Sequence, residues 1–247
     1  YLDARIATET QNRLGADIIM CFDECTPWPC PQRHLEKAVE RTIRWAEQCK
    51  AAHANGRQML FGIVQGGVDK ALRSRCAAAL VLMDFDGYAI GGLSVGEGHD
   101  LMTATVRHTA ALLPENKPRY LMGVGTPANL LEGIERGVDM FDCVMPTRNG
   151  RNGMLFTKNG VMNMRNKKWA TDFSPIEEDG AADVDRQYTR AYLRHLFIAD
   201  ELLALQIASI HNLAFYTWLM REARQHILNG DYSTWKPAML QSLSQRL

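Results

Sequence analysis

The residues most able to do chemistry in this sequence are two acids and two arginines. Asp142 lies in the apolar run DMFDCVMPTR, where a carboxylate nucleophile is expected to be poorly solvated, and Arg148 and Arg151 follow it closely. Asp23 ends an earlier apolar run, ADIIMCFDE. A carboxylate can attack an anomeric carbon to give a covalent glycosyl-enzyme, while a second acid handles protons at the leaving group. The structural alternatives are that backbone amides satisfy Asp142 in the core and that Asp23 caps the loop after its strand.

The two arginines begin a stretch of one-sided charge. From Met145 to Lys168 there are six cations and no acids, although the chain is balanced at 28 Lys and Arg to 28 Asp and Glu. A neutral chain has no net attraction for nucleic acid, so a local patch must hold any such partner. A solvated hairpin face is the ordinary explanation, but continuity with Asp142 favours a phosphodiester backbone entering the site. The six cations are Arg148, Arg151, Lys158, Arg165, Lys167 and Lys168.

The elements that would position these residues follow a regular alternation. Short apolar runs alternate with helix-period segments, and five such steps in a row predict a parallel sheet buried on both faces. In parallel α/β folds, ligands bind at the carboxyl ends of the strands. Strands are expected over 16–24, 57–67, 86–97, 119–125 and 138–148, with helices over about 33–53 and 69–83, a third ending near 113, and a short one after 125.

Every predicted strand ends in hydrogen-bonding groups or glycine. Taken singly these signals are weak, because a glycine pair usually just makes a turn. The string GVGTPANL lacks the Walker lysine and the G-x-G-x-x-G spacing, so a nucleotide site is disfavoured. Together they predict an active site at that edge of the sheet. The ends are Asp23 with Glu24, Gln65 to Gly67, Gly91 to Glu97, Met122 to Gly125, and Asp142.

The alternation stops after Arg148. A Lys-Asn-Gly turn between two short apolar runs predicts a hairpin, and an irregular stretch over 169–187 follows. The chain is then expected to be helical from Tyr188 to about Asn229, with a break near 209–212, a C-cap at Gly230 and no easy continuation past Pro237. The predicted domains are 1–148 with the active site, 149–187 as an inserted subdomain and 188–247 as carboxyl-terminal helices.

Length and composition limit the class of protein. A chain of 247 residues that is 46% hydrophobic can form one large domain or two modest ones. It has no apolar run of about 18 residues and no signal-peptide features at its start, so a cytoplasmic protein without membrane spans is expected. Its six cysteines include no C-x-x-C pair, which favours reduced thiols. Cys21, Cys25 and Cys30 match no common zinc spacing and are expected to be buried structural thiols.

Six strings closely resemble the bacterial tRNA-guanine transglycosylases, also called queuine tRNA-ribosyltransferases. The resemblance runs in order from about residue 16 to residue 216, and it implies a (β/α)8 TIM-type barrel with a hairpin and helical subdomain inserted after the strand that bears Asp142. It implies exchange of the wobble guanine of certain tRNAs for 7-aminomethyl-7-deazaguanine, a step of queuosine biosynthesis, through a covalent ribosyl-enzyme. It also implies a homodimer that binds the tRNA anticodon loop. The strings are DIIMCFDEC, LFGIVQGG, DGYAIGGLSVGEG, YLMGVG, FDCVMPTRNGRNGMLFT and YTRAYLRHLF with HNLAFY.

The same resemblance implies a role for each matching position. Asp142 matches the nucleophile that attacks the ribose C1′, and Arg148 and Arg151 match residues that contact tRNA. Cys25 with Val95 matches the bacterial pattern that accepts 7-aminomethyl-7-deazaguanine. The positions that match the base pocket are Asp23, Gln65 and Gly92 on the base edge, Leu93 through its backbone carbonyl, and Met122 packed on the base.

The chain departs from the family pattern at its amino end. The family carries an Asp-Ser-Gly-Gly segment whose aspartate is the general acid and base, and this sequence begins downstream of it. Five strands are visible where a closed barrel needs about eight. The expectation is a fragment from which the amino-terminal part of the barrel is absent, since an open sheet edge suits a stable monomer poorly.

The second departure is at the family's structural zinc site. The family binds zinc through C-x-C-x-x-C and a histidine, whereas this chain has Gly180, Ala182 and Asp185 at the cysteine positions and keeps only His211. One imidazole and one carboxylate cannot replace three thiolates, and structural zinc supplies on the order of 10 kcal/mol of folding free energy. We therefore expect no bound zinc, with 174–187 either repacked or mobile.

Two hypotheses of different class follow. The first is an enzyme that exchanges a tRNA base by double displacement at Asp142. The second is an impaired paralogue that binds tRNA or the base and acts as a partner subunit. Retention of Asp142, Asp23 and Gln65 favours the enzyme, and loss of the zinc thiols favours the paralogue only mildly.

Overall fold

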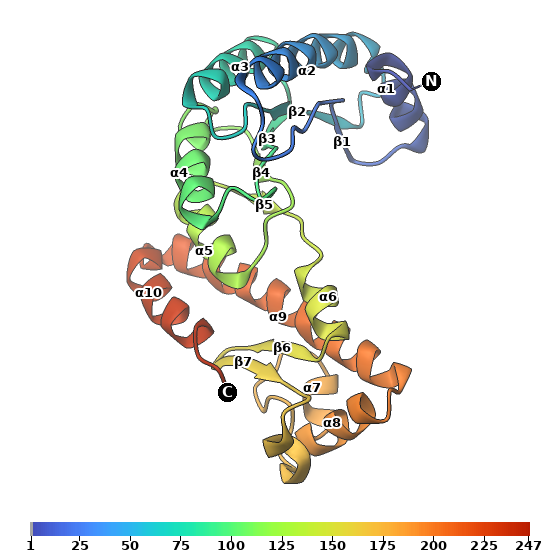
Figure 1. The fold of residues 1–247 in the computed structure, drawn as a ribbon, viewed down its shortest axis with the longest axis vertical. Helices are drawn as coiled ribbons and strands as arrows, with labels where there is room; N and C mark the ends of the chain where they lie inside the picture. Colours follow the sequence, from blue (N-terminus) through green and yellow to red (C-terminus); the bar gives the residue numbers. More distant parts are fainter. Residues whose placement is uncertain (1) are drawn as a thin grey trace. The chain divides into compact units, whose positions relative to one another are not determined.

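The computed structural model describes residues 2–247, which form two compact units. Of these residues, the first unit comprises 2–124 and 132–142, and the second comprises 125–131 and 143–247. The first holds the parallel sheet and the second holds the hairpin with most of the remaining helices (Figure 1).

The first unit contains a curled sheet of five parallel strands (Figure 1). The spatial order follows the chain order, so each strand pairs with the next one along the sequence, as repeated βα units produce. This confirms the predicted parallel sheet and gives a half-barrel arrangement. The strands are β1 (Ile18–Met20), β2 (Met59–Val64), β3 (Gly87–Ile90), β4 (Arg119–Leu121) and β5 (Met140–Phe141).

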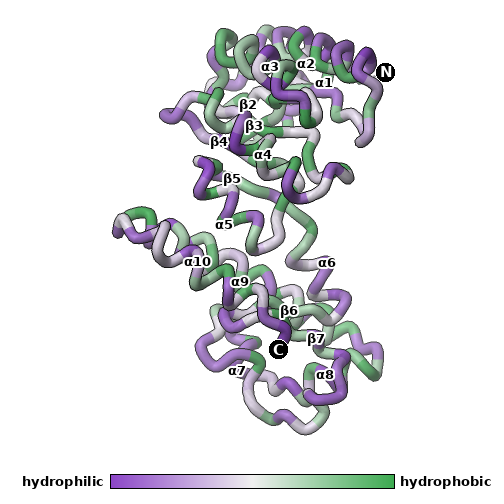
Figure 2. Tube along the Cα trace, turned by 60° about the vertical axis from the view of Figure 1, so that its left-hand side comes forward, coloured by the Kyte–Doolittle hydropathy of each residue, from purple (hydrophilic) through white to green (hydrophobic). Residues whose placement is uncertain are grey.

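Helices lie along the outer face of this sheet (Figure 1). Hydrophobic and hydrophilic residues alternate along α2 (Figure 2), and its buried residues, among them Leu35, Val39 and Ala46, repeat at helical spacing. The Asp69 side chain caps α3 by accepting a hydrogen bond from the backbone N–H of Leu72. The helices are α1 (Ala4–Leu14), α2 (Gln32–Ala52), α3 (Lys70–Leu82) and α4 (His99–Ala110), with α5 (Pro127–Glu135) spanning the division between units.

The second unit is built around a two-stranded antiparallel hairpin and one long helix. The hairpin confirms the Lys-Asn-Gly prediction. By length and composition alone α9 could cross a membrane, but its buried residues, Ala204, Ile207 and Ala208 among them, belong to the core of this unit. The elements are α6 (Met145–Arg151), β6 (Met154–Thr157), β7 (Gly160–Asn163), the 3-10 helix η1 (Lys167–Thr171), α7 (Val184–Gln187), α8 (Arg190–Ile198), α9 (Leu202–Asn229) and α10 (Tyr232–Leu243).

Three local predictions are wrong. The strand expected over 138–148 ends at Phe141, because Pro146 in the first turn favours a helix instead. No break occurs at 209–212; the helices separate earlier, where Asp200 adopts the left-handed φ of 57°. Pro237 lies inside α10, which continues although the proline has no N–H to donate. The predicted C-cap at Gly230 is confirmed by its left-handed conformation.

Candidate active site

The carboxyl ends of β1, β2 and β3 bring together Asp23, Gln65 and Gly92. The Gln65 side-chain amide donates a hydrogen bond to Asp23 Oδ2 at 2.6 Å, and Gln65 itself is only 2% exposed. Gly92 has a left-handed φ of +66°, and a Cβ built there would lie 2.2 Å from Gln65 Oε1. Only glycine therefore allows the third strand end to approach the amide so closely.

This arrangement presents a carboxylate and a primary amide to one small area. Asp23 is half-buried, and its burial raises its pKa, while the hydrogen bond from Gln65 opposes that shift. A planar heterocycle with adjacent donors and acceptors along its edge is the complementary ligand. Leu93 is buried beside Gly92, and half-buried Met122 follows β4, where its N–H donates to the carbonyl of Ile90.

A fully buried arginine underlies these strand ends, and the sequence analysis missed it. Arg73 donates from Nε to the carbonyl of Gly67 at 2.8 Å, from Nη1 to that of Val64 at 3.0 Å and from Nη2 to that of Gly91 at 2.8 Å. Desolvation lowers its pKa to about 10, so it stays charged at neutral pH. The signal for it in the sequence was the position of Arg73 on the buried face of α3, where a charged residue needs fixed hydrogen-bond partners.

The loop after β3 is held by its own acid. Glu97 is 7% exposed and accepts hydrogen bonds from the N–H groups of Ser94 at 2.5 Å and Val95 at 2.9 Å. A small crevice lined in part by Trp28, Gly92, Val95 and Glu97 lies beside it.

Of the three clustered cysteines, only Cys21 is buried, so the expectation for the other two is wrong. Cys25 is exposed because it lies in the loop after β1.

Asp142 follows β5 directly and is oriented by β4. Its Oδ1 accepts hydrogen bonds from the Tyr120 hydroxyl and from the N–H of Gly123, each at 2.7 Å. Within residues 2–247, Oδ2 accepts no hydrogen bond. The expectation of a poorly solvated carboxylate is wrong, because Asp142 is exposed at the end of a two-residue strand.

Tyr120 is the second site residue that the sequence analysis missed. It pairs in register with Met140, so Tyr120 and Asp142 lie two positions apart on the same face of adjacent strands. Burial and the hydrogen bond to Asp142 raise the pKa of the Tyr120 phenol, which therefore remains a donor at neutral pH. Alternate residues along β4 face the same side of the sheet, and this alternation was the signal for Tyr120 available in the sequence.

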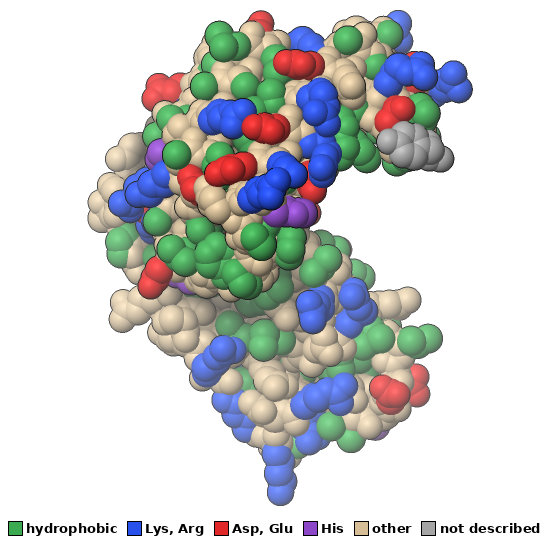
Figure 3. Space-filling model, turned by 45° about the horizontal axis from the view of Figure 1, so that its top comes forward, with side chains coloured by type: hydrophobic (Ala, Val, Ile, Leu, Met, Phe, Trp, Pro, Cys, Tyr) green, Lys and Arg blue, Asp and Glu red, His purple; other side chains and the backbone are tan. Residues whose placement is uncertain are grey.

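The predicted tRNA-contacting arginines lie on α6 in the second unit. Arg148 and Arg151 are exposed, and their guanidinium groups make no hydrogen bond or ion pair with residues 2–247. Figure 3 shows Lys and Arg side chains spread over the visible face of this unit. Two other cations of the basic stretch have partners: Lys158 donates to the carbonyl of Asp179 and Arg165 to that of Phe197.

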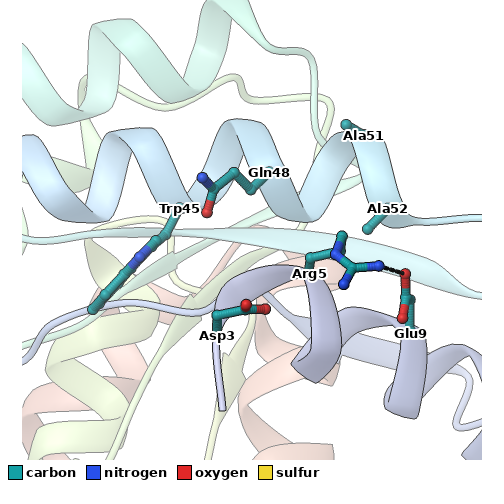
Figure 4. A pocket seen from close by; sticks show the side chains of 7 residues that line it. All are labelled: Asp3, Arg5, Glu9, Trp45, Gln48, Ala51 and Ala52. Carbon is teal, nitrogen blue, oxygen red and sulfur yellow. Dashed lines mark hydrogen bonds and ion pairs between the residues drawn. The ribbon is translucent and has the colours of Figure 1, made fainter. Parts of the chain in front are cut away.

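A separate groove in the first unit contains none of the predicted site residues. It lies between α1 and the carboxyl-terminal half of α2, and on α1 Arg5 pairs with Glu9 at 2.9 Å (Figure 4). The lining residues are Asp3, Arg5, Glu9, Trp45, Gln48, Ala51 and Ala52.

Comparison with known proteins places the chain in a family. The sequence profile of the family described as queuine tRNA-ribosyltransferase matches residues 1–245. The chain belongs to the queuine tRNA-ribosyltransferase family. A queuine tRNA-ribosyltransferase of Symbiobacterium thermophilum is 50% identical over 242 residues, which cover 98% of this chain and 60% of that protein.

Two further queuine tRNA-ribosyltransferases show the same relation. The protein of Pelotomaculum thermopropionicum is 54% identical over 224 residues, covering 91% of this chain and 60% of its own length. That of Francisella tularensis is 46% identical over 242 residues, covering 98% and 66%. The chain thus spans about 60% of the length of the first of these relatives. The matched part includes both units and every residue of the candidate site.

Proposed function

We propose that the protein containing this chain is a tRNA-guanine transglycosylase of queuosine biosynthesis. It exchanges the wobble guanine of specific tRNAs for 7-aminomethyl-7-deazaguanine. The observation that carries the proposal is the grouping of Asp23, Gln65 and Gly92 at the same edge of the sheet as an oriented carboxylate, Asp142. Family membership supports it, since the relatives described above are named queuine tRNA-ribosyltransferases.

The base pocket supplies the groups that a guanine-like edge requires. The carboxylate of Asp23 accepts hydrogen bonds from ring and exocyclic N–H groups, and the Gln65 amide both donates and accepts. Gly92 leaves room for the base, the Leu93 carbonyl accepts from it and Met122 packs on its face. Cys25 and Val95 border the pocket and select 7-aminomethyl-7-deazaguanine.

Asp142 is the nucleophile in a double displacement. In the first step Oδ2 forms a bond to the ribose C1′ as the bond from C1′ to guanine N9 breaks, and guanine leaves with the electron pair and takes up a proton. In the second step N9 of the incoming base gives up its proton and attacks C1′, and the Asp142 carboxylate leaves. Tyr120 and the N–H of Gly123 hold Oδ1, which aims Oδ2 at the sugar. We assign the proton transfers to no residue of this chain.

The rest of the family architecture follows as part of the proposal. Arg148 and Arg151 bind phosphates of the tRNA anticodon loop, because exposed guanidinium groups without protein partners are available to them. The five-stranded half-barrel is part of a (β/α)8 barrel in the whole protein, with residues 149–187 as its inserted subdomain. The protein acts in the cytoplasm as a homodimer.

The test is exchange of labelled guanine into tRNA by the intact protein. Asp142→Asn is expected to lower the exchange rate by about a thousandfold or more, because an amide cannot form the covalent bond. It should also abolish the tRNA adduct that survives denaturing electrophoresis. Asp139→Asn, at an exposed acid three residues earlier on the chain, is the matched control and should keep wild-type exchange. Wild-type exchange in Asp142→Asn would reject the nucleophile assignment.

The same assay separates the impaired paralogue. A wild-type protein that binds tRNA and the base but exchanges no guanine would support a binding subunit instead.

Tyr120→Phe tests the orientation of Asp142. The variant removes one hydrogen bond to a charged group, so we expect an exchange rate lower by about ten- to a hundredfold with an unchanged KM for tRNA.

A further inference from the structure

Three buried polar residues meet in the second unit, where the family resemblance implies a zinc ion. Glu177, Asp185 and His211 are 7%, 1% and 1% exposed, and the atoms that they could offer to a metal lie within 4.8 Å of one another. Asp185 occupies one cysteine position of the family pattern, and Gly180 and Ala182 occupy the other two. The question is whether this set suits a metal.

Each polar atom of the Asp185 and His211 side chains already has a partner. His211 Nδ1 lies 2.6 Å from Asp185 Oδ1, and His211 Nε2 lies 2.8 Å from the carbonyl oxygen of Phe156. Asp185 Oδ2 accepts a hydrogen bond from the N–H of Ala182 at 2.9 Å. A carbonyl oxygen can only accept, so Nε2 carries a proton, and a second proton is shared between Nδ1 and Asp185. The pair is neutral wherever that proton resides, so it needs no cation to balance a buried charge.

The geometry does not suit zinc. Two ligand atoms on one tetrahedral zinc, with bonds of about 2.0–2.1 Å, lie roughly 3.3 Å apart. The separation of 2.6 Å between His211 Nδ1 and Asp185 Oδ1 is that of a hydrogen bond with no room for an ion between them. The third member, Glu177, accepts a hydrogen bond from the N–H of Lys158 at 2.8 Å. A metal would therefore have to break bonds that the protein already makes.

Gly180 provides the space for this arrangement. A Cβ at residue 180 would lie 2.2 Å from Asp185 Oδ2 and 2.4 Å from Asp185 Cβ. Any side chain at 180, a cysteine included, would displace the carboxylate from its present position. Gly180 and Asp185 therefore act together: the absent side chain at one position makes room for the acid at the other.

We propose that Asp185 and His211 form a metal-free cross-link that takes the structural place of zinc in this protein. The link ties α7 to α9 and, through the Phe156 carbonyl, to β6, across sequence separations of 26 and 55 residues. Asn212 extends it, because its side chain accepts from the N–H of Phe156 and donates to the carbonyl of Pro146 on α6. The second unit keeps its fold without zinc, and this holds whether or not the transferase proposal is correct.

Zinc content tests the proposal directly. The intact protein, produced in zinc-supplemented medium, is expected to contain well under one zinc per ten chains by elemental analysis, and a chelator is expected to leave its Tm unchanged. The triple variant Gly180→Cys, Ala182→Cys, Asp185→Cys is the positive control, expected to bind about one zinc per chain and to lose Tm with chelator. A wild-type ratio near one, or a chelator-sensitive wild-type Tm, overturns the proposal.

Two substitutions at Asp185 test the hydrogen bonds themselves. Asp185→Ala leaves His211 buried without its partner and is expected to lower Tm by on the order of 5 °C. Glu178→Ala, at an exposed acid of the preceding loop, is the matched control and should leave Tm unchanged. Asp185→Asn should nearly keep the wild-type Tm, because its amide can donate to Nδ1 and accept from Ala182. A Tm loss in Asp185→Asn equal to that in Asp185→Ala contradicts the hydrogen-bonded link, as does an unchanged Tm in Asp185→Ala.

Discussion

At Asp23 the proposed function and the stability of the fold oppose each other. Its half-buried carboxylate faces Gln65, and burial raises its pKa above that of an ordinary aspartate. The folded state therefore favours the protonated form, and the free energy of unfolding falls as pH rises from the unfolded pKa through the folded one. At neutral pH the ionised carboxylate lowers stability but is the form that the proposed recognition of a base requires.

Asp23→Asn should separate these two effects. Removing the desolvated charge is expected to raise the free energy of unfolding at neutral pH by about 0.5–1 kcal/mol, after allowance for solvent screening. The gain should vanish below the pKa of an ordinary aspartate, where the carboxyl is protonated in both states. Denaturant unfolding at several pH values measures it, and the KM for the base should rise at the same time. Equal stability at neutral pH would show that burial of Asp23 carries no cost.

Arg73 gives a second prediction at the residue scale. Its three carbonyl partners flank Gln65 and Gly92, so we expect it to act as a positioning residue for the proposed base pocket. Arg73→Lys keeps the charge but cannot reproduce the planar set of donors, and should lower the free energy of unfolding by about 2–3 kcal/mol. We expect the KM for the base to rise about tenfold, from about 1.4 kcal/mol of lost positioning, with the KM for tRNA unchanged.

Leu80→Ala is the control for Arg73. Leu80 is fully buried on the same helix, and its truncation should cost about 2–5 kcal/mol in stability. The Leu80 side chain forms no hydrogen bond with the strand ends, so its truncation should leave the KM for the base unchanged. Equal increases in KM for both variants would mean that Arg73 acts only through stability.

The sequence predicted the positions of the site residues better than their surroundings. An acid after an apolar run correctly indicated Asp142 at a strand end, but the same run suggested burial, and the residue is exposed. Its orientation depends on Tyr120, whose role requires the register between β4 and β5. Arg73 was invisible for a similar reason: its partners are backbone carbonyls, which residue types do not reveal.

At the scale of elements, alternation was a sound guide in the first unit and a poorer one in the second. Five repeated βα steps predict a parallel sheet because each strand is buried on both faces. After Phe141 the structure depends on contacts distant in sequence. The sequence around His211 and Asn212 predicted a break in the helix. Their side chains instead form hydrogen bonds with β6 and α6, and α9 continues through both residues. Local propensity cannot anticipate such partners.

Gly150 yields the prediction that belongs to α6. A Cβ at this position would lie 2.9 Å from the carbonyl oxygen of Ala208 on α9. Gly150→Ala should force the two helices apart, lower the free energy of unfolding by about 1–3 kcal/mol, and displace Arg148 and Arg151 without removing their charge. Affinity for tRNA should fall, as measured by filter binding. Gly56→Ala, at a glycine with open space around it, should change neither quantity.

Considered as a whole, the neutral molecule consists of two units of opposite charge. The second unit contains 13 Lys and Arg and 10 Asp and Glu, a net of +3, and the first contains 15 and 18, a net of −3. A polyanion is therefore attracted to the second unit by a charge that the overall balance hides. Composition alone, averaged over the chain, argues against nucleic acid as a partner.

Salt dependence measures how many of these cations contact phosphate. The double variant Arg148→Ala, Arg151→Ala should reduce the slope of log K against log salt for an anticodon stem-loop by about 1.4, since each single-strand phosphate contact contributes about 0.7. Lys37→Ala with Arg44→Ala, two cations of α2 in the first unit, should leave the slope unchanged. An unaltered slope in the α6 variant would remove both arginines from the tRNA contact.

The glycine, alanine and aspartate at positions 180, 182 and 185 also change what an oxidant can do to this protein. Zinc thiolates lose their metal when peroxide oxidises the sulfur, and the fold that depends on them is lost with it. Residues 144–247 contain no cysteine at all. In the hairpin and the helices that follow it an oxidant finds no sulfur to attack except methionine, so the proposed cross-link should survive an oxidant that releases zinc from thiolates.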